Sequence, residues 1–192
     1  MNMTPQQKAA RWLESNRFIL DTETTGLGDD AEIVEICIID THGFIMLNTL
    51  IKPLNPIPET ATAIHGITNE MVAYAPTWRD VHGAVGELFF KNGFVIYNAD
   101  FDIRMIEQSA RLRGLGEDGF VSLAEQYAYC AMLAYAEFYG QKDERRGGYK
   151  WQKLTNAAEQ QGVIIQGSAH RALSDCLTTL GVIKAMAAGG AK

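Results

Sequence analysis

One short stretch near the N-terminus constrains the fold more than any other part of the chain. Three apolar residues at 18–20 predict a buried strand, and Asp21 and Glu23 follow them. Side chains two positions apart on a strand point to the same face, so the two carboxylates are expected to lie together. Like charges that close repel unless a proton or a divalent cation sits between them. The stretch therefore predicts a core strand that ends in a candidate metal site.

A second acidic motif follows a later apolar run. Residues 94–98 predict a short buried strand, which gives way to a helix at Asp100-Phe101-Asp102. The N-terminus of a helix favours carboxylates and keeps them ionised. Of the two aspartates, Asp102 is predicted to take part in the chemistry, whereas Asp100 is expected to cap the helix.

The third motif is His170-Arg-Ala-Leu-Ser-Asp175, at the start of the last helix. A separation of five residues corresponds to about 140° around a helix, so His170 is expected on the preceding loop, able to swing over the site. Asp175 has Leu173, Cys176 and Leu177 as neighbours, which indicates partial burial. A lone carboxylate resists such burial without a cation.

These three motifs suit one kind of reaction. Mg²⁺ and similar hard cations prefer oxygen ligands. Two such ions held by carboxylates can clamp a phosphodiester, one activating water and the other stabilising the leaving oxygen. A nearby histidine, with a pKa close to neutrality, can take the proton from the attacking water. The motifs together predict metal-dependent hydrolysis of a phosphodiester.

The composition bounds the class of protein. A length of 192 residues predicts one domain, and contents of 47% hydrophobic and 21% charged residues are typical of a soluble globular protein. No apolar run approaches the roughly 20 residues of a membrane helix, and the N-terminus leads into no apolar signal-type core. Cys37, Cys130 and Cys176 form no C-x-x-C pair, so buried free thiols in a reducing cytoplasm are expected.

The net charge of −6 restricts how this chain could bind nucleic acid. Proteins that bind a long duplex usually have a basic surface, because neutralisation of the phosphates by Lys and Arg supplies much of the affinity. Any nucleic-acid contact is therefore expected to be short and partly carried by metal ions. The one notable basic cluster, at 142–153, is interleaved with aromatic residues, a pattern that suits single-stranded nucleic acid. A solvated flexible loop is the simpler interpretation and is favoured.

The hydrophobic pattern predicts a strand meander followed by strands that alternate with helices. Strands are expected at about 17–23, 32–40, 44–51, 94–98 and 128–131. Helices are expected at about 4–15, 68–72, 76–90, 100–113, 122–127, 132–139, 151–161 and 171–188. Three prolines make 52–58 a surface connection, and Gly147-Gly148 makes 141–150 a loop. This order implies an α/β fold with a mixed central sheet.

The ordered motifs Asp-x-Glu-Thr-Thr-Gly, Asn-Ala-x-Phe-Asp and His-x-x-x-x-Asp resemble those of the DEDDh (DnaQ-like) 3′–5′ exonucleases. The resemblance covers about 17–185 and implies a ribonuclease H-like fold. It implies a single exonuclease domain over 1–192, in which an N-terminal helix (1–16) precedes the catalytic core (17–188). It also implies that two Mg²⁺ or Mn²⁺ ions bind Asp21, Glu23, Asp102 and Asp175, and that His170 is the general base.

The same resemblance implies a set of substrate contacts around the metal site. These residues are Thr24, Thr25, Gly26, Leu27, Ile64, His65, Asn98 and Phe101. For His65, a role as a turn residue beside Gly66 stays open. Tyr97 stands where many relatives have histidine, so local substrate contacts are expected to differ. Glu35, in the second strand, is either a further ligand or an outward-facing acid.

The predicted function is release of nucleoside 5′-monophosphates from the 3′ end of single-stranded or frayed DNA in the cytoplasm. An exoribonuclease, similar to oligoribonuclease or ribonuclease T, is the alternative, because no residue decides how the sugar 2′-OH is handled. A polymerase proofreading subunit is not favoured, since 17 residues follow Asp175. A non-catalytic adaptor that binds nucleic-acid ends is not favoured either, because all five catalytic-type residues are present. No membrane partner is expected.

Overall fold

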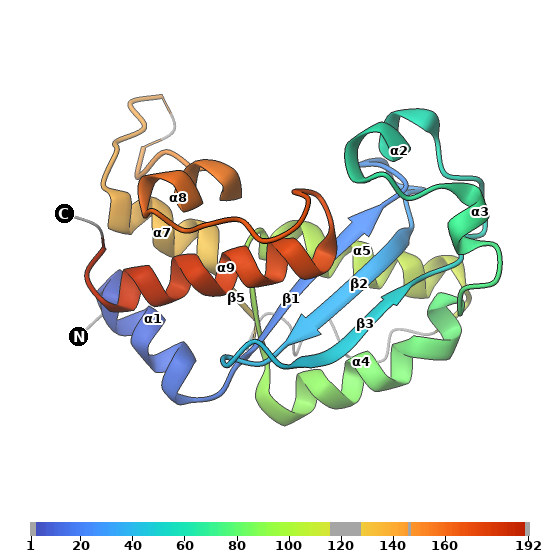
Figure 1. Ribbon diagram of the computed structural model, residues 1–192, viewed down its shortest axis with the longest axis horizontal. Coiled ribbons are helices and arrows are strands. Elements are labelled where there is room, and N and C mark those ends of the chain that lie inside the picture. The colour runs from blue at the N-terminus through green and yellow to red at the C-terminus, as the bar shows by residue number, and fades with distance from the viewer. Residues whose placement is uncertain (1–2, 116–127, 146, 191–192) are drawn as a thin grey trace.

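The computed structural model describes residues 3–115, 128–145 and 147–190, and its centre is a five-stranded mixed sheet (Figure 1). The strand order is β3-β2-β1-β4-β5. The strands are β1 (Phe18–Thr24), β2 (Ile33–Ile39), β3 (Ile45–Leu50), β4 (Phe94–Ile96) and β5 (Ala128–Cys130). The first three strands pair antiparallel, whereas β4 runs parallel to both β1 and β5. The predicted meander and mixed sheet are therefore confirmed.

Helices cover both faces of this sheet. They are α1 (Pro5–Glu14), α2 (Glu59–His65), α3 (Asn69–Val72), α4 (Trp78–Asn92), α5 (Ala99–Leu112), α7 (Ala131–Tyr139), α8 (Leu154–Gln160) and α9 (Ala172–Ala187). Figure 1 shows α9 in front of the strands and α5 behind them. Within the described ranges, no helix has both the length and the apolar character that a membrane crossing requires.

Alternation along β1 divides the interior into two cores. Ile19 faces a core that contains residues of α1, α7, α8 and α9, including the buried Trp12. Phe18 and Leu20 face the opposite core, which is built on α4 and α5 and includes the buried Trp78. Successive strand side chains point to opposite faces, so the residues that continue β1 must also divide between these two sides. That division determines where Asp21, Thr22 and Glu23 point.

A smaller apolar cluster supports α2 and α3 at one end of the sheet. Val34, Ile57, Ala61, Ile67 and Val72 are buried in this cluster. Figure 1 shows α2 and α3 grouped beside the ends of β1 and β2. The α2 helix is therefore packed against the sheet rather than carried on a loose connection.

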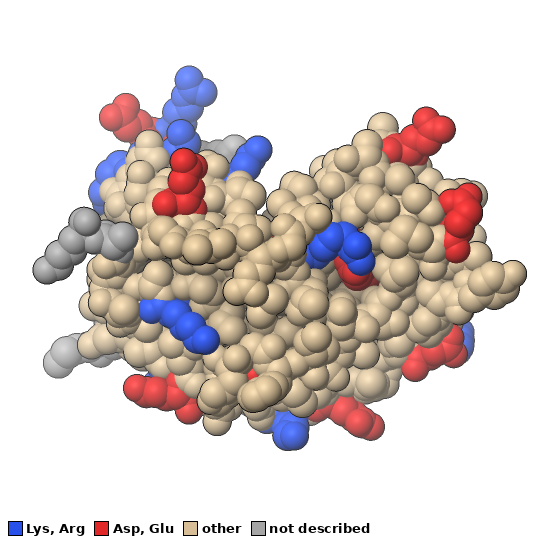
Figure 2. All heavy atoms as spheres, in the orientation of Figure 1, with Lys and Arg blue, Asp and Glu red and all other residues tan. Residues whose placement is uncertain are grey.

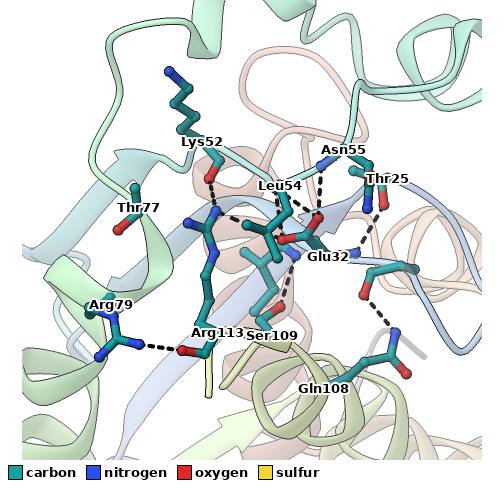
Figure 3. Close-up of polar contacts among 12 residues, drawn as sticks. Thr25, Glu32, Lys52, Leu54, Asn55, Thr77, Arg79, Gln108, Ser109 and Arg113 are labelled. Atoms are coloured by element: carbon teal, nitrogen blue, oxygen red, sulfur yellow. Dashed lines mark hydrogen bonds and ion pairs between the residues drawn. The ribbon is translucent and has the colours of Figure 1, made fainter. Parts of the chain in front are cut away.

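A buried carboxylate fixes the connection that leads into α2 (Figure 3). Glu32 accepts hydrogen bonds from the backbone N–H groups of Leu54 (2.8 Å) and Asn55 (3.2 Å). Arg113, at the end of α5, lies 3.8 Å from Glu32 and donates to the carbonyl of Lys52 at 2.6 Å. Because these bonds join the residue before β2 and the C-cap of α5 to residues 52–55, the start of the proline-rich segment is held in place on the surface.

Three local predictions need correction. The α2 helix was not predicted, because the prolines of 53–58 dominated the pattern; Pro58 is its N-cap, so every proline stays outside the helix. Asp100 is not the cap of α5, since β4 ends at Ile96 and the helix already begins after its N-cap Asn98. The α8 helix begins at Leu154 rather than near 151. The helix predicted at 122–127 lies outside the described residues.

Candidate active site

The predicted site residues, although far apart in sequence, line one cavity of about 620 Å³. These residues are Asp21, Glu23, Thr24, Thr25, Gly26, Leu27, Ile64, His65, Asn98, Phe101, Asp102, His170 and Asp175. The cavity lies where β1 ends, between α2, the first turns of α5 and α9, and the loop before α9. Figure 2 shows a hollow at the upper edge of the molecule, between the lobe of α2 and that of α8.

Strand β1 presents the first two carboxylates toward α9. Asp21 and Glu23 follow Ile19 at alternating positions, opposite Cys37 and Glu35 of β2. The register shifts between Glu23 and Thr24, where the strand leaves its regular pairing. Irregularities of this kind often lie beside functional sites, because they redirect a side chain. The prediction that the two carboxylates share a face is confirmed.

Asp102 reaches the same cavity from the opposite side of β1. Its side chain is 4% exposed. One carboxylate oxygen accepts from both the backbone N–H (3.0 Å) and the hydroxyl (2.7 Å) of Thr22. Burial raises the pKa of Asp102 to about 7, although the bonds from Thr22 act in the opposite direction. Thr22, which the sequence analysis did not single out, thus fixes the orientation of this carboxylate.

The carboxylates in the cavity make one another harder to ionise. Burial, followed by the charges of Asp102, Asp175 and Glu23, raises the pKa of Asp21 well above its ordinary value. Burial and the charges of Asp175 and Glu35 raise the pKa of Glu23 to about 8. Burial likewise raises the pKa of Asp175. A divalent cation would relieve this repulsion, and an all-oxygen donor set suits hard cations such as Mg²⁺.

His170 lies on the loop before α9, as predicted, and next to two of the carboxylates. Ligand atoms of Glu23, His170 and Asp175 all lie within 4.8 Å of one another. His170 is exposed, and its backbone has a φ of 60°, in the left-handed region. A non-glycine residue in that region is uncommon and is held there by its surroundings.

Glu35 supplies the contacts that hold this loop. Glu35 is 4% exposed, and its carboxylate accepts from the Arg171 guanidinium at 2.7 and 3.0 Å and from the Ala172 N–H at 3.0 Å. The two residues that follow His170 are therefore bonded to β2. The interpretation of Glu35 as an outward-facing acid is wrong, because Arg171 neutralises it in the interior. An acid inside the apolar run 33–39 and an arginine beside His170 were the sequence signals.

His65 is buried at the end of α2 and lines the cavity. Its Nδ1 accepts a hydrogen bond from the Ile67 N–H at 3.0 Å, whereas Nε2 is buried without a hydrogen-bond partner among the described residues. Burial lowers the pKa of His65, so the neutral ring is favoured. With Nδ1 as acceptor, Nε2 carries the proton. His65 therefore makes the turn contact with Ile67 and also lines the cavity.

Five further residues line the cavity and were not predicted as contacts. They are Thr22, Thr60, Ala61, Tyr97 and Leu154. Tyr97 is buried, and its hydroxyl donates to the carbonyl of Gln152 at 2.9 Å. Tyr97 thus joins the cavity wall to the segment before α8. Leu154 and Thr60 carry no chemical signal in the sequence, so only the fold reveals them.

Comparisons with known proteins identify relatives that are named as exonucleases. Residues 18–183 match the family model RNase_T, described as "Exonuclease". An uncharacterised exonuclease, CP81, of Escherichia phage 186 is 62% identical over 190 residues, which span 99% of this chain and 97% of that protein. Exodeoxyribonuclease 10 of Escherichia coli (strain K12) is 31% identical over 166 residues, 86% of this chain and 66% of that protein.

A solved structure shares the fold. Exonuclease X, determined in complex with 5′ overhanging duplex DNA, is 28% identical with a TM-score of 0.63; the match covers 87% of this chain and 89% of that one. The chain therefore belongs to the exonuclease family, in its DEDDh (DnaQ-like) group, and has the ribonuclease H-like fold. It is a nuclease of the hydrolase class.

The raised pKa values predict an unusual pH dependence of stability. Burial raises the pKa of Glu23 from 4.5 to about 8 and the pKa of Asp102 from 3.8 to about 7. Between these limits the folded protein binds more protons than the unfolded chain, so its free energy of unfolding falls as pH rises. In EDTA, the melting temperature is expected to fall from pH 5.5 to 8.5, and Mn²⁺ should restore it.

The Asp102→Asn variant provides the control. Removing one buried charge is expected to stabilise the metal-free protein at pH 8 by about 1–2 kcal/mol, and to flatten the pH dependence. Thermal unfolding of both proteins in EDTA measures this directly. A wild-type melting temperature that stayed level or rose from pH 5.5 to 8.5 would contradict the raised pKa values of Glu23 and Asp102.

Proposed function

We propose that the chain is a metal-dependent 3′–5′ exonuclease that releases nucleoside 5′-monophosphates from DNA. The observation that carries this proposal is the meeting of four carboxylates and one histidine in a single cavity. Three of the carboxylates, Asp21, Glu23 and Asp175, face α9 or lie on it, and Asp102 enters from α5. We further propose that residues 1–192 form one such domain and that it acts in the cytoplasm, where its free thiols would stay reduced.

The four carboxylates would hold Mg²⁺ or Mn²⁺, two ions per site. When bound, such ions supply an activated water and neutralise charge at the scissile phosphate. His170, which lies beside Glu23 and Asp175, would accept the proton of the attacking water. Thr22 holds Asp102 in one orientation, so this carboxylate needs no rearrangement to meet a cation.

The cavity is suited to the end of a strand. Leu27 and Ile64, 76% and 60% exposed, offer apolar surface at its mouth, and Phe101 adds an aromatic ring. The faces of a terminal base and sugar can pack on such groups, while the phosphate lies against the carboxylate side. DNA is favoured over RNA because the named relatives include an exodeoxyribonuclease and a structure with bound DNA.

A labelled oligonucleotide tests the polarity and the metal requirement together. Wild-type protein with Mg²⁺ or Mn²⁺ is expected to shorten a 5′-labelled single strand one nucleotide at a time and to stop in excess EDTA. The His170→Ala variant should lower kcat about 10²–10⁴-fold, because its proton acceptor is lost. Equal digestion in EDTA, or full activity of the variant, would refute the proposal.

The sugar of the substrate is tested in the same assay. DNA and RNA strands of identical sequence are digested side by side, and the DNA strand is expected to be degraded faster. A faster rate on RNA would reassign the protein as an exoribonuclease while leaving the hydrolytic mechanism intact. Immediate release of the 5′ label as a mononucleotide, without labelled strands of intermediate length, would contradict the polarity.

Glu35 is expected to act as a positioning residue for His170. Glu35→Gln removes the charge that binds Arg171 and Ala172, which releases the loop around the left-handed His170. Loss of a supporting contact of this kind costs about 10–100-fold in activity. We expect this loss in kcat, with KM and Mn²⁺ affinity changed less than about twofold.

Glu87→Gln, on the exposed face of α4, is the matched control for Glu35→Gln. It removes the same charge away from the cavity and should leave kcat unchanged. If Glu35→Gln also left kcat unchanged, or lowered only the thermal stability, Glu35 would be a structural residue alone.

A further inference from the structure

Residues 141–145 and 147–153, here called the basic hairpin, form a defined structure beside the cavity. Lys142 and Tyr149 make an antiparallel bridge, and the Lys150 N–H donates to the Gln141 carbonyl at 2.8 Å. The Gly147 N–H donates to the Asp143 carbonyl at 2.9 Å. The expectation of a flexible solvated loop is therefore incomplete, because the backbone of this segment is hydrogen-bonded to itself.

The basic hairpin concentrates positive charge on an acidic protein. Lys142, Arg145, Lys150 and Lys153 are exposed, against two acidic residues at 143 and 144, whereas the whole chain carries −6. Figure 2 shows several Lys and Arg side chains, with Asp and Glu among them, at the top of the lobe that carries α7 and α8, beside the hollow. A local positive surface of this kind attracts phosphates even when the net charge is negative.

Aromatic rings accompany these charges. The Lys142 Nζ lies 4.0 Å from the centre of the Tyr149 ring, and Trp151 is 54% exposed. These residues line a concave surface that encloses about 820 Å³, together with Arg145 and Lys150. Asp143 and Glu144 line it as well, so three basic side chains stand against two acidic ones. Cationic side chains interleaved with exposed aromatic rings bind single-stranded nucleic acid, the charges holding phosphates and the rings stacking on bases.

A buried glutamine joins the basic hairpin to the wall of the cavity. The Gln152 carbonyl accepts from the Tyr97 hydroxyl at 2.9 Å, and its side-chain amide donates to Gln141 (3.2 Å) and to the Lys150 carbonyl (3.1 Å). Tyr97 and Leu154 both line the cavity. The concave surface is therefore anchored at a fixed place relative to the site.

The chain length limits how far apart the two surfaces are. Trp151 precedes Leu154 by three residues, which span at most about 11 Å. Stacked nucleotides are spaced by about 3.4 Å along a strand. Roughly three nucleotides beyond the terminal one would thus bring a strand from the cavity to Trp151.

We propose that the basic hairpin binds the single-stranded segment that lies 5′ of the terminal nucleotide. Lys142, Arg145 and Lys150 contact its phosphates, and Trp151 stacks on a base. This inference rests on the proposed function, because it places the strand end in the cavity. The surplus of positive charge is small and belongs to one short segment, which fits a few nucleotides of a single strand rather than a long duplex.

The test variant replaces three charges by neutral side chains of similar shape: Lys142→Gln, Arg145→Gln and Lys150→Gln. For a 20-nucleotide oligothymidylate, KM is expected to rise about tenfold at low salt, and the slope of log KM against log salt to fall by about 2, since each lost phosphate contact contributes about 0.7. For the p-nitrophenyl ester of thymidine 5′-monophosphate, which occupies only the cavity, kcat and KM should stay within twofold.

The matched control has the same net charge as the hairpin variant, because it loses three positive charges from other surfaces. Its substitutions are Arg11→Gln, Lys91→Gln and Lys184→Gln, at exposed positions on α1, α4 and α9. This control should leave kcat and KM unchanged for both substrates. If the two triple variants shifted KM for the oligonucleotide equally, the effect would be one of net charge, and the inference would be overturned. An unchanged KM in the hairpin variant would overturn it as well.

Binding separates this inference from the proposed function. In an Asp21→Asn background, fluorescence anisotropy of a labelled oligothymidylate should show a Kd about tenfold weaker when the hairpin charges are removed, by the same loss of phosphate contacts. Failure of the wild type to hydrolyse either substrate would refute the proposed function. Equal Kd values with and without the hairpin charges would refute the inference, whatever the hydrolysis result.

Discussion

The mutual repulsion of carboxylates inside one cavity is the constraint on which the rest of the structure depends. Burial raises the pKa of Asp21, Glu23 and Asp175, and the charges of neighbouring acids raise those of Asp21 and Glu23 further, whereas His170 acts in the opposite direction on the pKa of Asp175. No folded chain gains stability from such a group unless protons or cations compensate the charge. The arrangement therefore destabilises the metal-free folded protein and favours the binding of divalent cations. This indicates a functional rather than a structural site.

The fold meets this constraint by drawing the four acids from three rigid elements. Strand β1 supplies two adjacent carboxylates, α5 supplies Asp102 with its two bonds from Thr22, and α9 supplies Asp175. Glu35 stands opposite Glu23 on β2, where a second free charge would add to the repulsion. Its bidentate contact with Arg171 offsets part of that charge and at the same time fixes the loop of His170. One ion pair thus serves both the electrostatics and the geometry of the site.

Much of this could be predicted from the sequence, because the informative signals are local. Alternation along β1, the apolar run of β2 and the order of the three motifs gave the sheet, and every predicted site residue lines the cavity. The failures have a common cause in long-range contacts. The sequence left Glu35 open as a further ligand or an outward-facing acid, because its partner Arg171 lies 136 positions away. The α2 helix was missed because the prolines of 53–58 dominated the local pattern, while the cluster of Val34, Ile57 and Ala61 that supports the helix spans distant segments. The position of the basic hairpin depends on Tyr97 and Gln152, a pair that no periodicity reveals.

A titration of the metal-free protein with Mn²⁺ tests the central claim most directly. Calorimetry at pH 8 is expected to show two ions bound per chain, with an affinity that falls as pH is lowered through 8 to 7, because Glu23 and Asp102 then take up protons. Asp21→Asn should lose at least one of the two ions. Saturable binding that was absent at pH 8, or a stoichiometry and affinity unchanged in Asp21→Asn, would contradict the account.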